Sequence, residues 1–71
     1  MNQEKETELG LLRYWFNTYY PEHEQKFRRL YSLNIKCDDG TDPYEQLMSL
    51  YKEAEIKRKR IQELENLLNI K

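Results

Sequence analysis

Residues 42–71 read DPYEQLMSLYKEAEIKRKRIQELENLLNIK, and this stretch determines the fold that the sequence predicts. Asp42 is suited to the N-cap of a helix, because its carboxylate can accept the free N–H groups of the first turn. Pro43 follows at the position where its missing N–H costs nothing, and Glu45 completes a capping box with Asp42. The pattern therefore predicts one long helix over about residues 43–69.

Apolar residues recur along this helix in steps of three and four, and a charged residue, Lys57, occupies one position of the series. A seam of this kind over about three heptads is the lower limit for a coiled coil. The sequence therefore predicts that one stripe of the helix packs against another helix. That stripe consists of Leu47, Leu50, Ala54, Ile61, Leu64 and Leu68.

The composition is that of one small, polar, ordered domain. Its 71 residues leave room for a single core, which is marginal unless the chain oligomerises. The hydrophobic fraction is 38% and the charged fraction 35%, and the 13% of aromatic residues argues against disorder. The net charge of −1 provides no overall field that attracts nucleic acid or anionic lipid.

The sequence shows no sign of secretion or membrane insertion. Its first residues, MNQEKETE, contain no apolar core after a basic start, so they do not resemble a signal peptide. No apolar run approaches the roughly 20 residues that cross a bilayer. The single cysteine, Cys37, cannot form an internal disulfide and suits a reducing compartment. We therefore expect a cytoplasmic protein that does not enter a membrane.

Two shorter helices are predicted before the long one. The first is expected over about residues 4–18, because Leu9, Leu12, Phe16 and Tyr19 recur at helical spacing. The second is expected over about residues 21–34, where one face carries His23, Phe27, Leu30 and Tyr31. Asp39-Gly40 favours a turn, so residues 35–42 are predicted to form a loop.

Pro21 leaves two alternatives for the junction between these helices. Proline disfavours a helical conformation at Tyr20 and removes a hydrogen-bond donor, so the chain could break here and restart with Pro21. Asn17 and Thr18 are also weak helix residues, which favours the break. The alternative is a single helix kinked at Pro21.

Neither catalytic nor metal-binding residues are predicted. His23 lies between two glutamates, but adjacent helical residues do not face each other, so neither carboxylate can orient the imidazole as a general base. Asp38 and Asp39 are adjacent and do not fit the alternating ligands of a calcium loop. Cys37 alone provides too few ligands for zinc. We expect no enzyme activity, no cofactor and no metal.

The sharpest local feature is a basic segment, residues 57–60, whose four cations could contact phosphate groups. Four successive cations spread around a helix, however, and glutamates four residues earlier can pair with two of them. The chain's six tyrosines suit either an interface or the rim of a small core. The possible nucleic-acid contacts are Lys26, Arg28, Arg29, Lys57, Arg58, Lys59 and Arg60.

The length of the third helix suggests self-association. At 1.5 Å per residue it spans roughly 40 Å, so two half-length helices folded back on it would cover only its first half. A single kinked helix would instead give a thin two-helix hairpin, which also needs a partner to close a core. The predicted dimer interface is Leu50, Ala54, Ile61, Leu64, Leu67 and Leu68.

The charges beside the seam slightly favour a parallel dimer. With Leu47 at heptad position a, Glu53 would face Arg58 and Arg60 would face Glu65, and both contacts are attractive. Because only two pairs support this direction, an antiparallel dimer remains open.

The sequence therefore predicts an all-α fold: a small three-helix domain with a long, coiled-coil-like C-terminal helix, in a bundle completed by self-association. The predicted function is a non-enzymatic protein–protein interaction or assembly module that forms homodimers and binds another protein. The alternative is a small nucleic-acid-binding accessory or regulatory protein that uses the basic residues.

Overall fold

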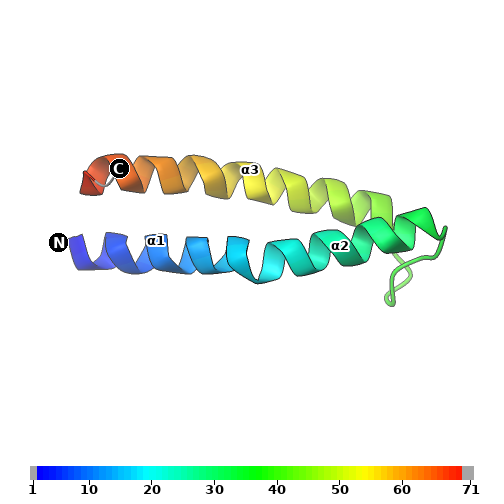
Figure 1. Ribbon diagram of the computed structural model, residues 1–71. Helices are drawn as coiled ribbons and strands as arrows, with labels where there is room; N and C mark the ends of the chain where they lie inside the picture. The colour runs from blue at the N-terminus through cyan, green and yellow to red at the C-terminus, as the bar shows by residue number, and fades with distance from the viewer. Residues whose placement is uncertain (1, 70–71) are drawn as a thin grey trace.

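The computed structural model describes residues 2–69, of which 82% are helical and none forms a strand. Helix α1 spans Asn2–Asn17, α2 spans Tyr19–Ser32 and α3 spans Pro43–Leu68. Figure 1 shows α1 and α2 following one another almost in line, while α3 runs back along both. The all-helical prediction is confirmed, and the chain is a hairpin with two long arms.

The junction between α1 and α2 lies at Thr18, three residues before Pro21. Thr18 leaves helical geometry at φ −121° and ψ −70°, although its N–H and its hydroxyl both donate to the Tyr14 carbonyl, at 2.9 and 2.7 Å. Pro21 is thereby the third residue of α2, within the first turn, where backbone N–H groups have no helical partner. Because the break at Thr18 precedes Pro21, the proline ring does not clash with the backbone carbonyl of a preceding helical turn.

The prediction that Pro21 opens the second helix is wrong, because Tyr19 and Tyr20 already belong to α2. The end predicted at Asn34 is also too late, since Asn34 adopts a left-handed conformation at φ 58°. The alternative of one kinked helix describes the arrangement better, because α1 and α2 remain nearly collinear (Figure 1). This collinearity determines which part of α3 is covered.

The start of α3 at Pro43 and its cap by Asp42 are as predicted, but no hydrogen bond from Glu45 completes a capping box among the described residues. Asp42 is extended, at φ −77° and ψ 124°, and its Oδ1 accepts the Tyr44 N–H at 3.0 Å. Pro43 occupies the first turn, where no donor is needed. The loop before it contains a tight turn at Gly40, whose φ of 84° is accessible to glycine without strain.

Loss of this cap has a measurable consequence. Replacing Asp42 by Ala leaves the Tyr44 N–H without its acceptor, and we expect the free energy of unfolding to fall by about 1 kcal/mol. Thermal unfolding followed by circular dichroism measures the change. Asp38→Ala, in the same loop with a fully exposed side chain, is the control and should be close to neutral. Equal effects of the two substitutions would show that the cap contributes nothing.

The core is a single seam between the two arms. Its apolar members are Leu9 from α1 and four residues of α3, and Ala54 and Leu64 have no exposed surface. The heptad stripe of α3 therefore packs inside the chain. The buried α3 residues in this seam are Leu47, Leu50, Ala54 and Leu64.

The expectation that two short helices would cover only the first half of α3 is wrong. Because α1 and α2 have 16 and 14 residues and stay in line, together they match the 26 residues of α3. Helix α1 lies along the second half of α3, where Arg13 forms an ion pair with Glu65 at 2.6 Å. A second ion pair joins Glu8 and Arg60 at 2.6 Å. The C-terminal part of α3 is thus covered by the chain itself.

Candidate interaction surface

One face of the hairpin carries a row of α3 residues spaced seven apart, which places them on the same side of the helix. Each member of the row contacts a residue of the other arm. We call this surface the tyrosine face. Its α3 row is Tyr44, Tyr51, Arg58 and Glu65, and its residues on the other arm are Arg13, Phe16, Tyr20, Glu24 and Tyr31.

The two ends of the tyrosine face differ in chemistry. Near the loop, the rings of Tyr31 and Tyr44 lie with centroids 5.8 Å apart, and both side chains are about half exposed. At the opposite end, Arg13 and Glu65 form their ion pair. The face therefore begins with two phenols and ends with a charged pair.

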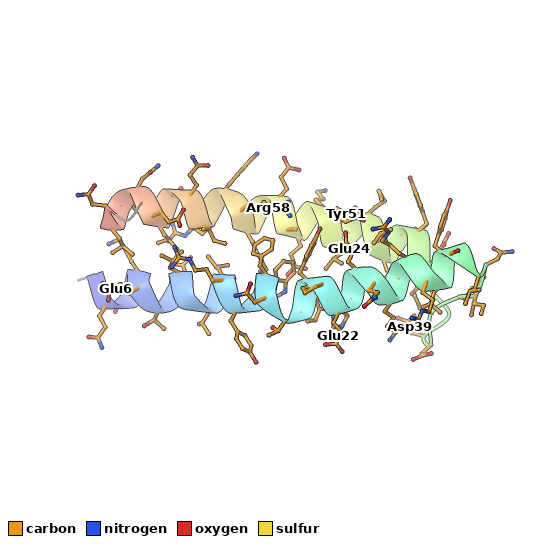
Figure 2. All side chains as sticks on the ribbon, viewed as in Figure 1. Glu6, Glu22, Glu24, Asp39, Tyr51 and Arg58 are labelled. Atoms are coloured by element: carbon orange, nitrogen blue, oxygen red, sulfur yellow. The ribbon has the colours of Figure 1, made fainter. Side chains whose placement is uncertain are left out.

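The centre of the tyrosine face holds a carboxylate between two phenols. The Tyr20 hydroxyl donates to Glu24 at 3.4 Å, and the Tyr20 and Tyr51 rings lie 6.5 Å apart. Burial, together with a hydrogen bond to Glu24, raises the pKa of Tyr51 above its ordinary value. Figure 2 shows Glu24 and Tyr51 close together between α2 and α3. The Tyr51 phenol therefore stays a neutral donor at physiological pH.

Arg58 lies beside this centre and has no carboxylate within 4 Å in the described part of the chain. Its guanidinium instead covers two rings, 5.2 Å from the Phe16 centroid and 5.7 Å from the Tyr20 centroid. A shallow groove of about 390 Å³ adjoins it, lined also by Arg13, Asn17 and Ile61. A guanidinium held on aromatic rings keeps its N–H donors available to an external acceptor.

The opposite face carries an aromatic ladder with residues four apart on α1 and α2. The Trp15 and Tyr19 rings are stacked at 5.6 Å, the Tyr19 and His23 rings at 3.7 Å, and Phe27 follows at 6.0 Å. His23 Nδ1 lies 2.8 Å from the Tyr19 carbonyl, a hydrogen bond that requires the proton on Nδ1. His23 is thus held by its own helix.

The charges on the opposite face are neutralised within the chain. Lys57 stands 5.0 Å over the Trp15 ring and pairs with Glu53 at 3.2 Å. Arg60 pairs with Glu8 through two nitrogens and also with Glu63. The tyrosine face, by contrast, retains a cation and an anion that are not paired with each other.

The predicted nucleic-acid contacts are not gathered into one patch. Lys57 lies over the Trp15 ring and Arg58 over the Phe16 ring, because successive helical residues point about 100° apart. Lys59 pairs with Glu55 at 3.6 Å and Lys26 with Asp38 at 4.0 Å, both on the exposed surface. Two further predicted contacts, Arg28 and Arg29, lie on α2.

The predicted dimer interface is largely inside the hairpin. Leu50, Ala54 and Leu64 are buried against the other arm, Ile61 and Leu68 are half-buried, and Leu67 is 57% exposed. The reason is that α1 continues in line with α2 and lies along the second half of α3.

The charges expected to join two parallel helices also have partners within one chain. Glu53 pairs with Lys57, Arg60 with Glu8, and Glu65 with Arg13. The remaining charge of that set, Arg58, lies on its rings. A parallel coiled coil through this seam would have to break these contacts.

The Glu8–Arg60 contact makes stability depend on pH. Hydrogen bonding to the Arg60 guanidinium lowers the pKa of Glu8 below its ordinary value of 4.5, so the ionised form stabilises the folded chain. This stabilisation is present above pH 4.5 and is lost as pH falls through the lower folded-state pKa. We expect Glu8→Gln to lose stability at neutral pH and to converge with the wild type in acid. Thermal unfolding at several pH values tests this, and a constant difference between the proteins would contradict it.

Several kinds of site are not found among residues 2–69. No group of three or more His, Cys, Asp or Glu side chains in this range is placed to hold a metal ion. None of the described helices is both long enough and apolar enough to cross a membrane.

Comparison with known proteins adds no family to this geometry. No family model, no curated protein and no solved structure matches the chain.

Proposed function

We propose that this protein is a non-enzymatic, cytoplasmic protein-interaction or assembly module that works as a homodimer. The surface of the single chain carries the proposal. The 8.8 kDa chain exposes 5769 Å², whereas a compact monomer of this mass exposes about 4,800 Å². The excess of roughly 1,000 Å² is close to the ~800 Å² that each partner buries in a standard interface.

The shape of the chain supports the same proposal. Its radius of gyration is 15.1 Å and its extents are 47 × 19 × 16 Å, whereas a compact domain of this length has a radius near 11 Å. Two helix layers cannot enclose a core on both sides, and pairing two hairpins gives a four-helix bundle. The tyrosines along one face are of the type enriched in interfaces, with a large apolar ring and a polar tip.

Sedimentation analysis tests the proposal. We expect the wild-type chain to sediment with twice its 8.8 kDa mass at micromolar concentration, and its unfolding midpoint to rise with concentration because dimerisation stabilises only the folded state. A chain that remains monomeric up to high micromolar concentration, with a constant midpoint, would overturn the proposal.

The nucleic-acid alternative is the weaker of the two. Lys57, Lys59 and Arg60 have carboxylate partners, and the cations lie on different faces, so few are free to replace counterions on a phosphate backbone. We expect no measurable binding to duplex DNA at about 50 mM salt, where such contacts are strongest. Salt-sensitive binding in a fluorescence anisotropy titration would restore this alternative.

A further inference from the structure

We propose that the tyrosine face is where a second copy of the chain docks, in antiparallel orientation about a two-fold axis near Tyr20. In this arrangement Arg58 of each copy pairs with Glu24 of the other. The inference rests on the proposed self-association and specifies its interface. It is carried by the order of charges and tyrosines along the face.

Two opposite charges on this face have no partner of opposite charge within 4 Å in the described chain. Arg58 lies on the Phe16 and Tyr20 rings, and among residues 2–69 Glu24 accepts hydrogen bonds from the Tyr20 and Tyr51 phenols. Both groups therefore sit between the arms, near the midline of the face. They are separated along the hairpin, because Glu24 lies at the level of Tyr51 (Figure 2). Tyr51 precedes Arg58 by seven residues, or ~10 Å of helix.

A two-fold interface is self-complementary: if one residue contacts a second across the axis, the second also contacts the first. An axis that crosses the hairpin midway between Tyr51 and Arg58 reverses the direction of the second copy. It brings Arg58 to the level of the other copy's Tyr51 and Glu24, twice in each dimer. A parallel arrangement would place Arg58 beside Arg58 on the midline, and like charges in an interface are unfavourable.

The remaining residues of the row fit the same axis. When Tyr44, Tyr51, Arg58 and Glu65 are read in the reverse direction, Tyr44 falls opposite Glu65 and Tyr51 opposite Arg58. Each charged residue then faces a tyrosine, whose hydroxyl can donate to a carboxylate and whose ring can accept a guanidinium. No two like charges of the row meet.

Tyr20 marks the centre of the arrangement. Its ring lies below Arg58 and its hydroxyl donates to Glu24, so it sits between the two charges that exchange partners. The axis therefore brings the two Tyr20 side chains close together. Desolvated aromatic residues at the centre of an interface, surrounded by polar contacts, are the usual source of binding energy.

The opposite face is less suited to a second copy. Its principal charges are already paired within the chain, as Arg60 is with Glu8 and Lys57 with Glu53. Ile56, 62% exposed on α3, lies outside the tyrosine-face row and provides a control position.

The test uses two charge reversals in the full-length chain. Arg58→Glu places negative charges opposite Glu24, and Glu24→Arg places positive charges opposite Arg58. Each variant alone should dimerise about tenfold or more weakly than the wild type, because like charges then meet twice across the axis. Mixed in equal amounts, the two variants should form a heterodimer with near wild-type affinity, since every crossed pair is then attractive. Sedimentation equilibrium measures the affinities, and circular dichroism checks that each variant is folded.

Each other outcome separates this inference from the proposed function. A wild type that never dimerises removes both. If the wild type dimerises but neither charge reversal weakens the dimer, the homodimer stands and this interface is wrong. The same conclusion follows if the weakened variants do not regain affinity when they are mixed. Ile56→Glu should leave the dimer intact; if this control dissociates the dimer and the reversals do not, the interface lies outside the tyrosine face.

Discussion

Leu64→Ala is expected to lower the free energy of unfolding by about 3 kcal/mol, within the 2–5 kcal/mol typical of buried leucines. The Leu64 side chain has no exposed surface, because α1 covers this part of α3. Truncation removes its transfer free energy and leaves a cavity that two rigid helices can only partly close. Small domains have little stability to spare, so such a loss would leave a substantial unfolded fraction at room temperature.

Leu67 is the matched control for this substitution. It is the same residue type three positions further along α3, but it is 57% exposed, so Leu67→Ala should cost no more than about 0.5 kcal/mol. Urea unfolding at one fixed chain concentration measures both variants, since dimerisation couples concentration to stability. If the two substitutions cost the same, α1 does not cover the second half of α3. The structure thus predicts that Leu64→Lys would unfold the hairpin instead of only dissociating a dimer.

The second large effect is expected from enlarging Ala54. Its side chain is fully buried at the seam where the two arms meet, and leucine would add three carbon atoms at this close contact. We expect Ala54→Leu to destabilise the chain by about 1–3 kcal/mol, because a larger residue forces the helices apart or its neighbours into strained rotamers.

Ser49→Leu provides the control for this substitution. Ser49 is exposed on the same helix, so leucine at this position adds comparable volume and helix propensity without meeting the other arm. The same urea titration compares the two variants. A stabilising effect of Ala54→Leu would mean that the seam contains unfilled space, and would contradict the close approach of the arms at this level.

Local signals in the sequence were sufficient for the elements themselves. The Asp42-Pro43 pair places the start of α3 correctly, because a cap acts within a single turn and needs no tertiary partner. Proline at position 21 signals an interruption, and the interruption exists. Its location at Thr18 is not predicted by the sequence. Pro21 is accommodated because it lies in the first turn of α2, where its missing N–H is not needed, and the sequence does not specify which earlier residue ends α1.

The candidate interface was only partly visible in the sequence. The tyrosine composition favours an interface or the rim of a core, and the spacing of Tyr44, Tyr51, Arg58 and Glu65 at intervals of seven is present in the sequence. Their partners on the other arm were not predictable, because contacts such as Arg58 with Phe16 join residues far apart in sequence. Only the pairing of the arms shows that Glu24 and Arg58 occupy one face without pairing with each other.

The helical class, the capped start of α3 and the heptad stripe that this helix must bury all follow from the order of the amino acids, because each depends on residues within a few turns. What covers that stripe depends on how the helices pack in three dimensions. A small change of direction at Thr18 would have sent α1 away from α3, whereas the observed collinearity lays it along the second half of the helix. A change in backbone direction at one residue displaces the far end of the 16-residue helix α1 by a large distance. For this reason the apolar stripe of α3 that was expected to lie between two chains forms the core of a single chain.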